Sequence, residues 1–329
     1  MTTIEDVAKL AGYSRATVSR VINNYPHVSE EKRRKVLQAM DELGYVPNSI
    51  ARNLRTQTNE TIGVLIPRLS NPFFSKLVDT MENIAAENGF QVIVCQTRSD
   101  QHRELLYLNW LKTRQMGGVI LASSENQWEV IKGYREFGPI IFCNEYPPHT
   151  EAPIVCLDQC KGGYIGTKHL IERGHTKIAH CYAGSQFTNI RDRFKGFKQA
   201  LEEYGLTLRS EWIFKDAYDT RDGQRIYHEI MALKDRPTAV FTSSDEVALG
   251  LIAEAKKYHT RVPDDLAVLG FDDQPIAALM DPSMTTIYQP VEQIGQKAIE
   301  LMIRLLKGEQ EPKHKVIELP LHLIVRNST

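Results

Sequence analysis

The chain of 329 residues lacks several features that define whole classes of protein. No apolar run approaches the ~20 residues that a membrane-spanning helix needs, and no basic and apolar signal sequence precedes the first helical pattern. The five cysteines include Cys156 and Cys160 but form no C-x-x-C pair. An odd count without that spacing favours reduced thiols over a disulfide framework or a zinc site. We therefore expect a cytoplasmic protein that binds neither a membrane nor a metal.

Motifs of the common enzyme classes are also missing. The chain contains no G-x-G-x-x-G, no G-x-x-x-x-G-K-[ST], no G-x-S-x-G and no H-E-x-x-H. His228 and Glu229 lack the second histidine of a zinc protease. Asp272 and Asp273 are neighbours at the end of a predicted strand, so their side chains are expected to point apart. We therefore predict no catalytic residues, no cofactor and no enzyme activity.

Neither sign of charge dominates the chain, which has 40 basic and 41 acidic residues. The distribution of charge is more informative than its sum. Between Ala8 and Asn24 the chain carries Lys9, Arg15 and Arg20 and no acid. A dimer would double this basic stretch, which is typical of a surface that binds nucleic acid.

Three short helices are predicted within the first 45 residues. Thr3 and Asp6 have the spacing of a capping box, Gly12 has the place of a helix-ending glycine, and Ser14 and Ser29 can cap the second and third helices. The expected buried faces, at helical spacing, are Ile4, Val7, Ala8 and Ala11, then Val18, Val21 and Ile22, then Val36, Leu37, Met40 and Leu43. The tight turn after the first helix predicts a helix-turn-helix.

The second of these helices is expected to read DNA. Arg15 lies at its N-terminus, where a guanidinium can donate two hydrogen bonds to guanine, and Arg20 is the second candidate. Ala16 offers only a methyl contact to thymine. The predicted base-reading set is Arg15, Ala16, Thr17 and Arg20, and the predicted phosphate contacts are Ser14, Asn23 and His27.

Residues 3–23 carry the pattern T-I-x-D-V-A-x-x-A-G-x-S-x-x-T-V-S-R-V-I-N. This pattern closely resembles the start of the lactose-repressor/galactose-repressor (LacI/GalR) family of bacterial transcription regulators, and the match continues to about Leu54. Tyr13 departs from the valine that is usual in the turn. The resemblance implies a homodimer that binds a palindromic double-stranded operator in the bacterial cytoplasm, at the nucleoid. It also implies a repressor of carbon or sugar metabolism genes.

A further short helix is expected from 49 to 55, with Ala51 and Leu54 on one side. It is too short to be stable alone in water. Two interpretations stay open: it packs on its own domain, or it folds only against its twin and DNA, with Leu54 wedged between base pairs in the minor groove. The family uses this position as such a lever, so the resemblance favours Ala51 and Leu54 as minor-groove residues.

After Thr61 short apolar runs alternate with amphipathic helices. This rhythm predicts parallel sheets with helices on both faces, and it restarts after Asp158, so we expect two α/β lobes. Strands are predicted at 61–67, 90–96, 117–123, 138–144, 153–158, 177–183, 211–216, 238–243, 266–271 and 285–290. The family has this arrangement, which resembles periplasmic binding proteins with three crossings between the lobes. The crossings are expected near 158–162, 289–291 and Leu319.

The expected domains follow from these patterns and the resemblance. Residues 1–47 form the helix-turn-helix domain, and 48–60 form the hinge helix and linker. The N-terminal lobe of the core comprises 61–158 and 290–318. The C-terminal lobe comprises 159–289 and 319–329.

Polar and aromatic side chains follow the predicted strands, and parallel sheets bind ligands beyond the carboxyl ends of their strands. Arg193 falls in the family pattern R-x-x-G-F that carries a ligand-binding arginine, and Asp272 matches the aspartate of G-[FY]-D. The expected effector-binding residues are Phe73, Phe74, Ser123, Asn144, Asp158, Arg191, Arg193, Tyr218 and Asp272. Aromatic rings beside carboxylates and an arginine suit a small polyhydroxylated molecule, a sugar or sugar phosphate. For Asn71, Ser124, Ser244 and Asp273 we expect helix N-capping instead.

The resemblance extends to the catabolite-control-protein-like subgroup, in which a phosphocarrier protein docks on a late helix that corresponds to 291–307. That docking uses a Tyr-Asp-Ile-Gly run and a downstream arginine. This chain has Glu292-Gln293-Ile294-Gly295 there, with Glu300 and Arg304 downstream. An acid where an arginine should meet the phosphate would repel it by like charge. We therefore expect no phosphocarrier docking. The alternatives are a two-lobed sugar-binding module, which would need a secretion signal and no DNA-reading helix, and a sugar-metabolising enzyme.

Overall fold

The structure is a computed structural model that describes residues 2–22, 25–45, 59–184, 188–312 and 315–329. The chain divides into two compact units, Met1–Thr58 and Asn59–Thr329. None of the described helices is long and apolar enough to cross a membrane. The five cysteines are free thiols.

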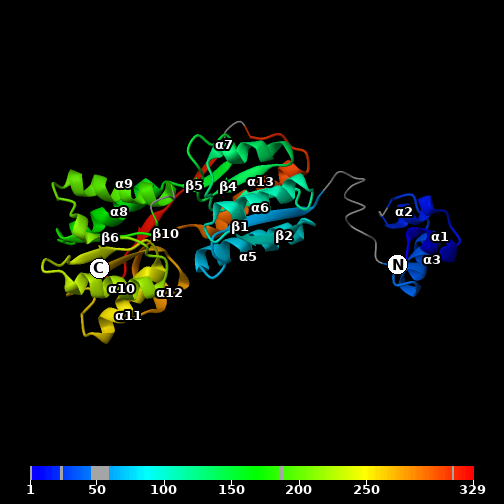
Figure 1. Cartoon of the computed structure of the whole chain (residues 1–329). Coiled ribbons are helices and arrows are strands. Elements are labelled where there is room, and N and C mark those ends of the chain that lie inside the picture. The colour runs from blue at the N-terminus through cyan, green and yellow to red at the C-terminus, as the bar shows by residue number, and fades with distance from the viewer. Residues whose placement is uncertain (1, 23–24, 46–58, 185–187, 313–314) are drawn as a thin grey trace. The chain divides into compact units, whose positions relative to one another are not determined.

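The N-terminal unit contains α1 (Ile4–Ala11), α2 (Arg15–Ile22) and α3 (Glu30–Glu42) (Figure 1). Thr3 and Asp6 form the predicted capping box, and Gly12 ends α1 with a φ of 72°, a conformation that glycine adopts without a Cβ clash. Ser14 Oγ accepts a hydrogen bond from the Thr17 backbone at 3.2 Å. The buried core comprises Val7, Ala8, Val18, Val21, Val36 and Ala39. The predicted three-helix arrangement is therefore confirmed.

Two details of the third helix differ from the prediction. Ser29 stands at the N-cap position of α3, but its side chain makes no capping hydrogen bond. Leu37, predicted as buried, is 50% exposed. Its position follows Val36 by 100° around the helix, whereas Ala39 follows Val36 by three residues and returns to the same face. Ala39 therefore takes the buried place assigned to Leu37.

The first lobe of the larger unit contains a six-stranded sheet. Its strands are β1 (Thr61–Ile66), β2 (Gln91–Gln96), β3 (Gly118–Leu121), β4 (Ile140–Cys143), β5 (Ile154–Leu157) and β11 (Val316–Leu319), in the order β11-β5-β4-β3-β1-β2. All neighbouring strands are parallel. The helices of this lobe are α5 (Pro72–Glu87), α6 (Gln101–Lys112), α7 (Trp128–Ile131) with the 3₁₀ turn η1 (Lys132–Glu136), and α13 (Val291–Leu306).

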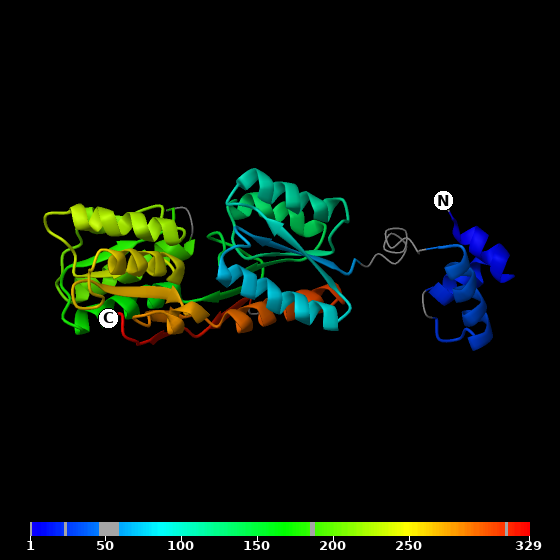
Figure 2. The same cartoon turned by 90° about the horizontal axis from the view of Figure 1, so that it is seen from below.

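The apolar residues of this sheet serve both of its faces. Ile62, Val64 and Ile66 of β1 belong to the core cluster that α5 and α13 cover. Leu65, between them, belongs to the cluster under α6 and α7. Successive strand residues point to opposite faces, so the continuous apolar run of β1 reflects burial from both sides (Figure 2).

The second lobe also contains a six-stranded sheet covered by helices. Its strands are β6 (Ile178–Cys181), β7 (Ile213–Phe214), β8 (Ala239–Phe241), β9 (Ala267–Asp272), β10 (Thr285–Tyr288) and β12 (His322–Ile324), in the order β12-β10-β9-β8-β6-β7. Only β10 and β12 are antiparallel among the described pairs. The helices are α8 (Gln159–Glu172), α9 (Thr188–Glu203), α10 (Thr220–Ala232), α11 (Asp245–Lys257) and α12 (Pro275–Leu279), with the 3₁₀ turn η2 (Ser210–Trp212).

Glycines bring the helices of this lobe unusually close together. A Cβ on Gly163 of α8 would lie 2.0 Å from the backbone oxygen of Arg193 on α9, and one on Gly196 of α9 would lie 1.9 Å from a backbone oxygen of α8. Gly223 and Gly250 have the same relation between α10 and α11. The α8–α9 contact fixes where the first turns of α9 lie.

The chain passes between the lobes three times. It leaves the first sheet after β5 and enters α8 at Gln159, and it returns from β10 to α13 through Gln289 and Pro290. The last passage joins β11 of the first sheet to β12 of the second. In Figure 1 these connections lie side by side between the lobes. The carboxyl ends of both sets of parallel strands lie next to them.

Candidate functional site

The outward face of α2 is the first candidate site. Arg15, Ala16 and Arg20 are exposed, while Val18 and Val21 are buried in the helical core. Thr17 is half-buried, and Ser14 and His27 are exposed. The structure therefore presents the predicted base-reading arginines on one accessible helix. Asn23, Ala51 and Leu54 lie outside the described residues.

Arg15 is engaged in an ion pair. Its Nη1 lies 3.0 Å from Glu5 Oε1, and the two side chains are 68% and 66% exposed. An ion pair this exposed contributes little stability. The guanidinium is therefore free to exchange Glu5 for another acceptor at small cost.

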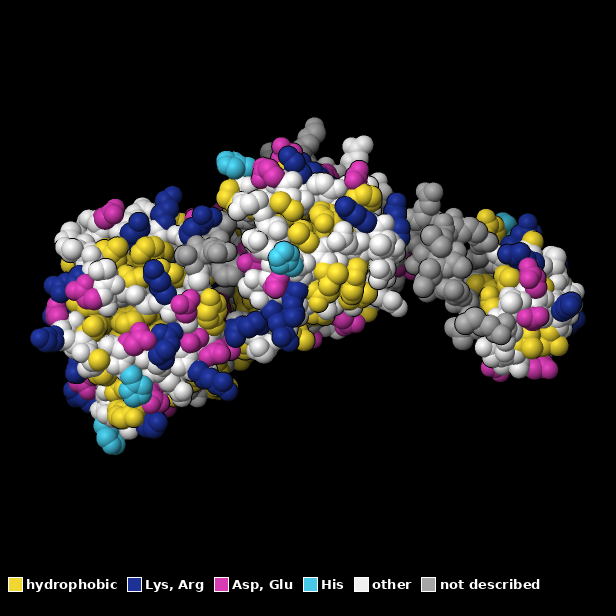
Figure 3. Space-filling view, viewed as in Figure 1, with side chains coloured by type: hydrophobic (Ala, Val, Ile, Leu, Met, Phe, Trp, Pro, Cys, Tyr) yellow, Lys and Arg dark blue, Asp and Glu magenta, His cyan; other side chains and the backbone are white. Residues whose placement is uncertain are grey.

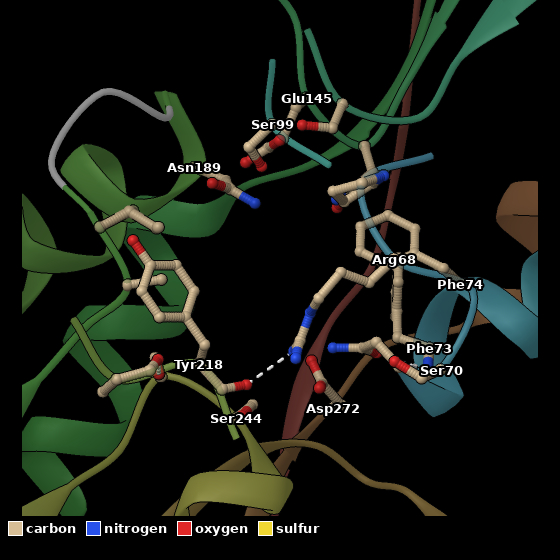
Figure 4. Close-up of a pocket in the computed structure, with 18 of the residues that line it drawn as sticks. Arg68, Ser70, Phe73, Phe74, Ser99, Glu145, Asn189, Tyr218, Ser244 and Asp272 are labelled. Carbon is tan, nitrogen blue, oxygen red and sulfur yellow. Dashed lines mark hydrogen bonds between the residues drawn. The ribbon is translucent and has the colours of Figure 1, made fainter. Parts of the chain in front are cut away.

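The second candidate site is a cavity of about 530 Å³ between the two lobes of the larger unit (Figure 4). Its volume is typical of small-molecule sites. Seven of the nine predicted effector-binding residues line it: Phe73, Phe74, Ser123, Asn144, Arg193, Tyr218 and Asp272. Phe73 and Phe74 meet edge to face, with ring centroids 5.1 Å apart. In Figure 4 the two rings and Tyr218 lie on opposite walls.

Asp158 and Arg191 do not line the cavity. The carboxylate of Asp158 accepts a hydrogen bond from the Lys161 backbone at 2.8 Å and caps α8. Arg191 is exposed on the first turns of α9. Because successive helix residues are 100° apart, Arg193 turns inward while Arg191 turns outward.

Arg193 is the centre of a buried hydrogen-bond network. Its Nε donates to Gln159 Oε1 at 2.7 Å and its Nη1 to the Ser243 backbone oxygen at 2.9 Å. The guanidinium also stacks on the Phe271 ring, 3.5 Å from the centroid. Burial lowers the pKa of Arg193 to about 10, which leaves it charged at neutral pH.

The network continues through the crossing segments to Asp272. Gln159 Nε2 lies 3.4 Å from both Asn144 Oδ1 and Gln289 Oε1. Gln289 Nε2 donates to Asp272 Oδ1 at 2.6 Å. One side chain of the first lobe, two of the crossings and two of the second lobe are thus joined at the floor of the cavity.

The backbone of Asp272 is strained. Its φ is 118°, a region that residues with a Cβ rarely occupy and that costs about 1–3 kcal/mol. The side chain is held by Gln289 and Gln274, and burial raises the pKa of its carboxyl. Asp245, behind it, accepts from the Gln274 backbone at 2.7 Å and from Thr286 at 2.6 Å. Backbone strain that the surrounding hydrogen bonds maintain is typical of binding sites.

Several lining residues were not predicted. Arg68 lies two residues after the end of β1, and its Nη2 donates to the Tyr218 backbone oxygen of the other lobe at 2.7 Å. Asn189 comes from the first turn of α9, and Gln289 from a crossing. Glu145 is adjacent to the predicted Asn144 at the end of β4. That adjacency at a strand end is the sequence signal that could have included it.

Two of the four expected N-caps are confirmed. Asn71 accepts from the Phe73 backbone at 2.9 Å and Ser244 from the Val247 backbone at 3.4 Å. The expectation is wrong for Ser124, which hydrogen-bonds Glu104 and the Asn126 backbone. It is also wrong for Asp273, which accepts from Arg326 at 2.7 Å. In both cases a partner distant in sequence competes for the side chain.

Glu145 gives a testable consequence for stability. The residue is 7% exposed, and burial raises the pKa of its carboxyl from 4.5 to about 7. Its neutral form is therefore favoured in the folded state, and the associated stability is lost as pH rises from about 4.5 through about 7. We expect Glu145→Gln to match the wild type at pH ~5 and to exceed its free energy of unfolding by about 1–3 kcal/mol at pH ~8, as measured by urea denaturation.

Glu254→Gln is the matched control because its effect should have the opposite sign. His228 and Lys257 hold the pKa of the Glu254 carboxyl below its usual value, so removing this charge should lower stability at pH ~8. A Glu145→Gln protein that is less stable than the wild type at pH ~8 would contradict the assignment of a destabilising charge.

The exposed charges on one face of the larger unit carry no comparable signal. On the face seen in Figure 3, Lys and Arg side chains are interspersed with Asp and Glu. An interspersed surface of this kind does not mark a nucleic-acid site. The two candidate sites are therefore the α2 surface and the cavity.

Comparisons with known proteins agree with a DNA-binding unit followed by a ligand-binding unit. Residues 3–48 match the profile described as "Bacterial regulatory proteins, lacI family", and residues 167–329 match "Periplasmic binding protein-like domain". The chain is 42% identical over 329 residues to the NTD biosynthesis operon regulator NtdR of Bacillus subtilis (strain 168), with 100% of both chains covered. The chain belongs to the LacI family.

Solved structures of LacI-family regulators have the same fold. The Lac repressor dimer bound to operator and the anti-inducer ONPF is 26% identical and superposes with a TM-score of 0.86, with 99% of this chain and 98% of that chain covered. The complex of the transcriptional regulator CelR with cellobiose is 28% identical, with a TM-score of 0.72 and 100% of both chains covered.

This LacI-family protein is a DNA-binding transcription regulator with an α/β core of two lobes, as the sequence predicted. The relatives compared are transcription regulators and not enzymes. The narrower resemblance to the catabolite-control subgroup stays a prediction.

Proposed function

We propose that the protein represses genes of carbon or sugar metabolism in the bacterial cytoplasm, and that it binds a palindromic operator as a homodimer. In this proposal residues 1–47 of each subunit place α2 in one major groove. Residues 48–60 connect this domain to the core, with Ala51 and Leu54 at the minor groove. A small polyhydroxylated effector in the cavity changes the angle between the lobes and, through it, the affinity for DNA.

The observation that carries this proposal is the occurrence of both sites in one chain. A helix-turn-helix with exposed Arg15 and Arg20 supports base reading, since arginine is the commonest partner of guanine. The cavity supports ligand control because its walls come from both lobes. The operator-bound Lac repressor and the cellobiose-bound CelR are similar proteins whose partners are those proposed here.

The DNA-reading role is tested by Arg15→Ala. We expect a loss of about 1–3 kcal/mol in operator binding and a relaxed preference at one base pair, because a bidentate contact to guanine is removed. The measurement is fluorescence anisotropy with a duplex that the wild-type protein selects from genomic fragments, together with all single-base variants of that duplex.

Arg34→Ala is the control, since Arg34 is an exposed arginine on α3 and should leave base preference unchanged. An equal loss on every duplex for Arg15→Ala would show that Arg15 contacts phosphate and not a base. A wild-type protein that selects no genomic fragment would contradict the proposed function itself.

A further inference from the structure

Buried oxygens without a hydrogen-bond partner among the described residues lie at one end of the cavity and in the loop beside it. They are Ser123 Oγ, Glu125 Oε1 and Asn189 Oδ1. Ser123 is only 2% exposed, and Ser123 and Asn189 line the cavity. Buried polar oxygens are almost always paired in native proteins. The side chains that approach these oxygens are the carboxyls of Glu125 and Glu145, which accept when ionised, so a bound group that donates several hydrogen bonds would complete this end.

The same end holds carboxylates without a cation. Glu145 lines the cavity. The charge of Glu125 repels the Glu145 carboxylate, and the charge of Glu104 repels the Glu125 carboxylate. Burial raises the pKa values of Glu125 and Glu145 to about 7. Within the described ranges, no lysine, arginine or histidine forms an ion pair with these three acids. Figure 4 shows Glu145, Ser99 and Asn189 gathered at this end.

Glu104 holds the loop in place and is not available to a ligand. Its carboxylate is fully buried and accepts from the Glu125 backbone at 2.7 Å and from the Asn126 backbone at 3.2 Å. The loop that follows β3 is thereby fixed with Ser123 and Glu125 beside the cavity. The acidic end is built by the fold and does not depend on a flexible side chain.

The nearby arginines do not neutralise this end. Arg193 is a basic residue whose charge favours the ionised form of Glu145, but its guanidinium donates its hydrogen bonds to Gln159 and Ser243. Arg68 extends to the opposite end, where it donates to Tyr218 and Figure 4 shows it beside Asp272. Arg98 also lines the cavity, but its side chain is exposed and forms no ion pair with these acids within the described ranges. The carboxyls at the Glu145 end thus have no cation in direct contact.

We infer that the effector carries an ammonium group, bound at Glu145, Ser123 and Asn189, on a polyhydroxylated ring that lies between Phe73 and Tyr218. An ammonium supplies three donors and the missing positive charge in one group, whereas a hydroxyl supplies a single donor and leaves the buried charges uncompensated. A phosphate at this end would be repelled. This inference rests on the proposed effector role of the cavity.

A bound metal ion is a poorer match to the same end. In the part of the chain that the structure describes, no group of three or more His, Cys, Asp or Glu side chains is arranged to hold one. The unpaired set also includes an amide and a hydroxyl oxygen, which are common partners of an organic ammonium.

The test is calorimetric titration of the full-length protein with singly amino-substituted glucoses, with the amine at carbon 2, 3, 4 or 6. D-glucose and N-acetyl-D-glucosamine are the neutral comparisons. We expect at least one amino sugar to bind about 10- to 100-fold more tightly than glucose, because a charge-assisted contact is gained. Glu145→Gln keeps the shape of the side chain and should remove this preference.

Glu254→Gln is the matched control, since Glu254 is a largely buried glutamate outside the cavity and should keep the preference. Glucose binding as tight as every amino sugar, an unchanged preference in Glu145→Gln, or no binding of any amino sugar would each overturn the inference. Gel retardation of operator DNA with the same protein separates the two proposals. Retained DNA binding without an amine preference contradicts the inference alone, whereas absent DNA binding contradicts the proposed function.

Discussion

Replacing Gly163 with alanine is expected to lower the free energy of unfolding by about 3 kcal/mol or more. The added Cβ would lie 2.0 Å from the backbone oxygen of Arg193 and 2.8 Å from its carbonyl carbon. Since the obstacle is backbone, no side-chain rotation relieves the overlap, and α8 and α9 must move apart. Urea denaturation followed by circular dichroism measures the loss.

Gly133→Ala provides the control for this prediction. A Cβ at Gly133 meets nothing within 4 Å, and its backbone does not have a positive φ. That substitution should be neutral or stabilising by up to about 1 kcal/mol, because alanine has less conformational entropy to lose. If Gly163→Ala proved as stable as Gly133→Ala, the close approach of α8 and α9 would not be needed for stability.

Replacing Arg193 with methionine is expected to weaken effector binding by about 100-fold or more. Methionine keeps an unbranched apolar side chain but removes the buried charge, its donors and the guanidinium that stacks on Phe271. Gln159 Oε1 and the Ser243 backbone oxygen would lose their partner, and Asp272 would lose the cation that favours its ionised form. The measurement is calorimetric titration with the panel sugar that the wild-type protein binds most tightly.

Arg191→Met is the control because Arg191 is exposed and does not line the cavity. Its affinity for the sugar should stay within about threefold of the wild type, as is usual for surface substitutions. Arg193→Lys, which keeps the charge without the guanidinium fork, should fall between the two. Wild-type affinity in a folded Arg193→Met protein would remove Arg193 from the binding site.

The fold was largely predictable because both sheets are buried from two sides. Each of the ten predicted strands overlaps an observed strand, since parallel strands covered by helices are continuous apolar runs. The strands β11 and β12 were not predicted. In β11 exposed and half-buried residues alternate and include Glu318, and β12 has three residues, so neither gives a strong apolar signal.

The residues that line the cavity could be predicted only where they lie at or soon after the end of a strand. Phe73, Ser123 and Asp272 were found because they follow β1, β3 and β9 within a short loop or end the strand itself. Gln289 and Asn189 were not, because their place depends on how the crossings and α9 are folded. Asp158 shows that a strand end can also mislead. It follows β5 directly, but its side chain caps α8 and does not line the cavity. The next residue, Gln159, joins the hydrogen-bond network of Arg193 instead.

The crossings themselves determine how a ligand could act. Gln159 and Gln289 belong to two of the three passages between the lobes, and Gln289 also lines the cavity. A molecule in the cavity is therefore placed to contact Gln289 directly and, through its contact with Gln159, to affect two of the passages that join the lobes.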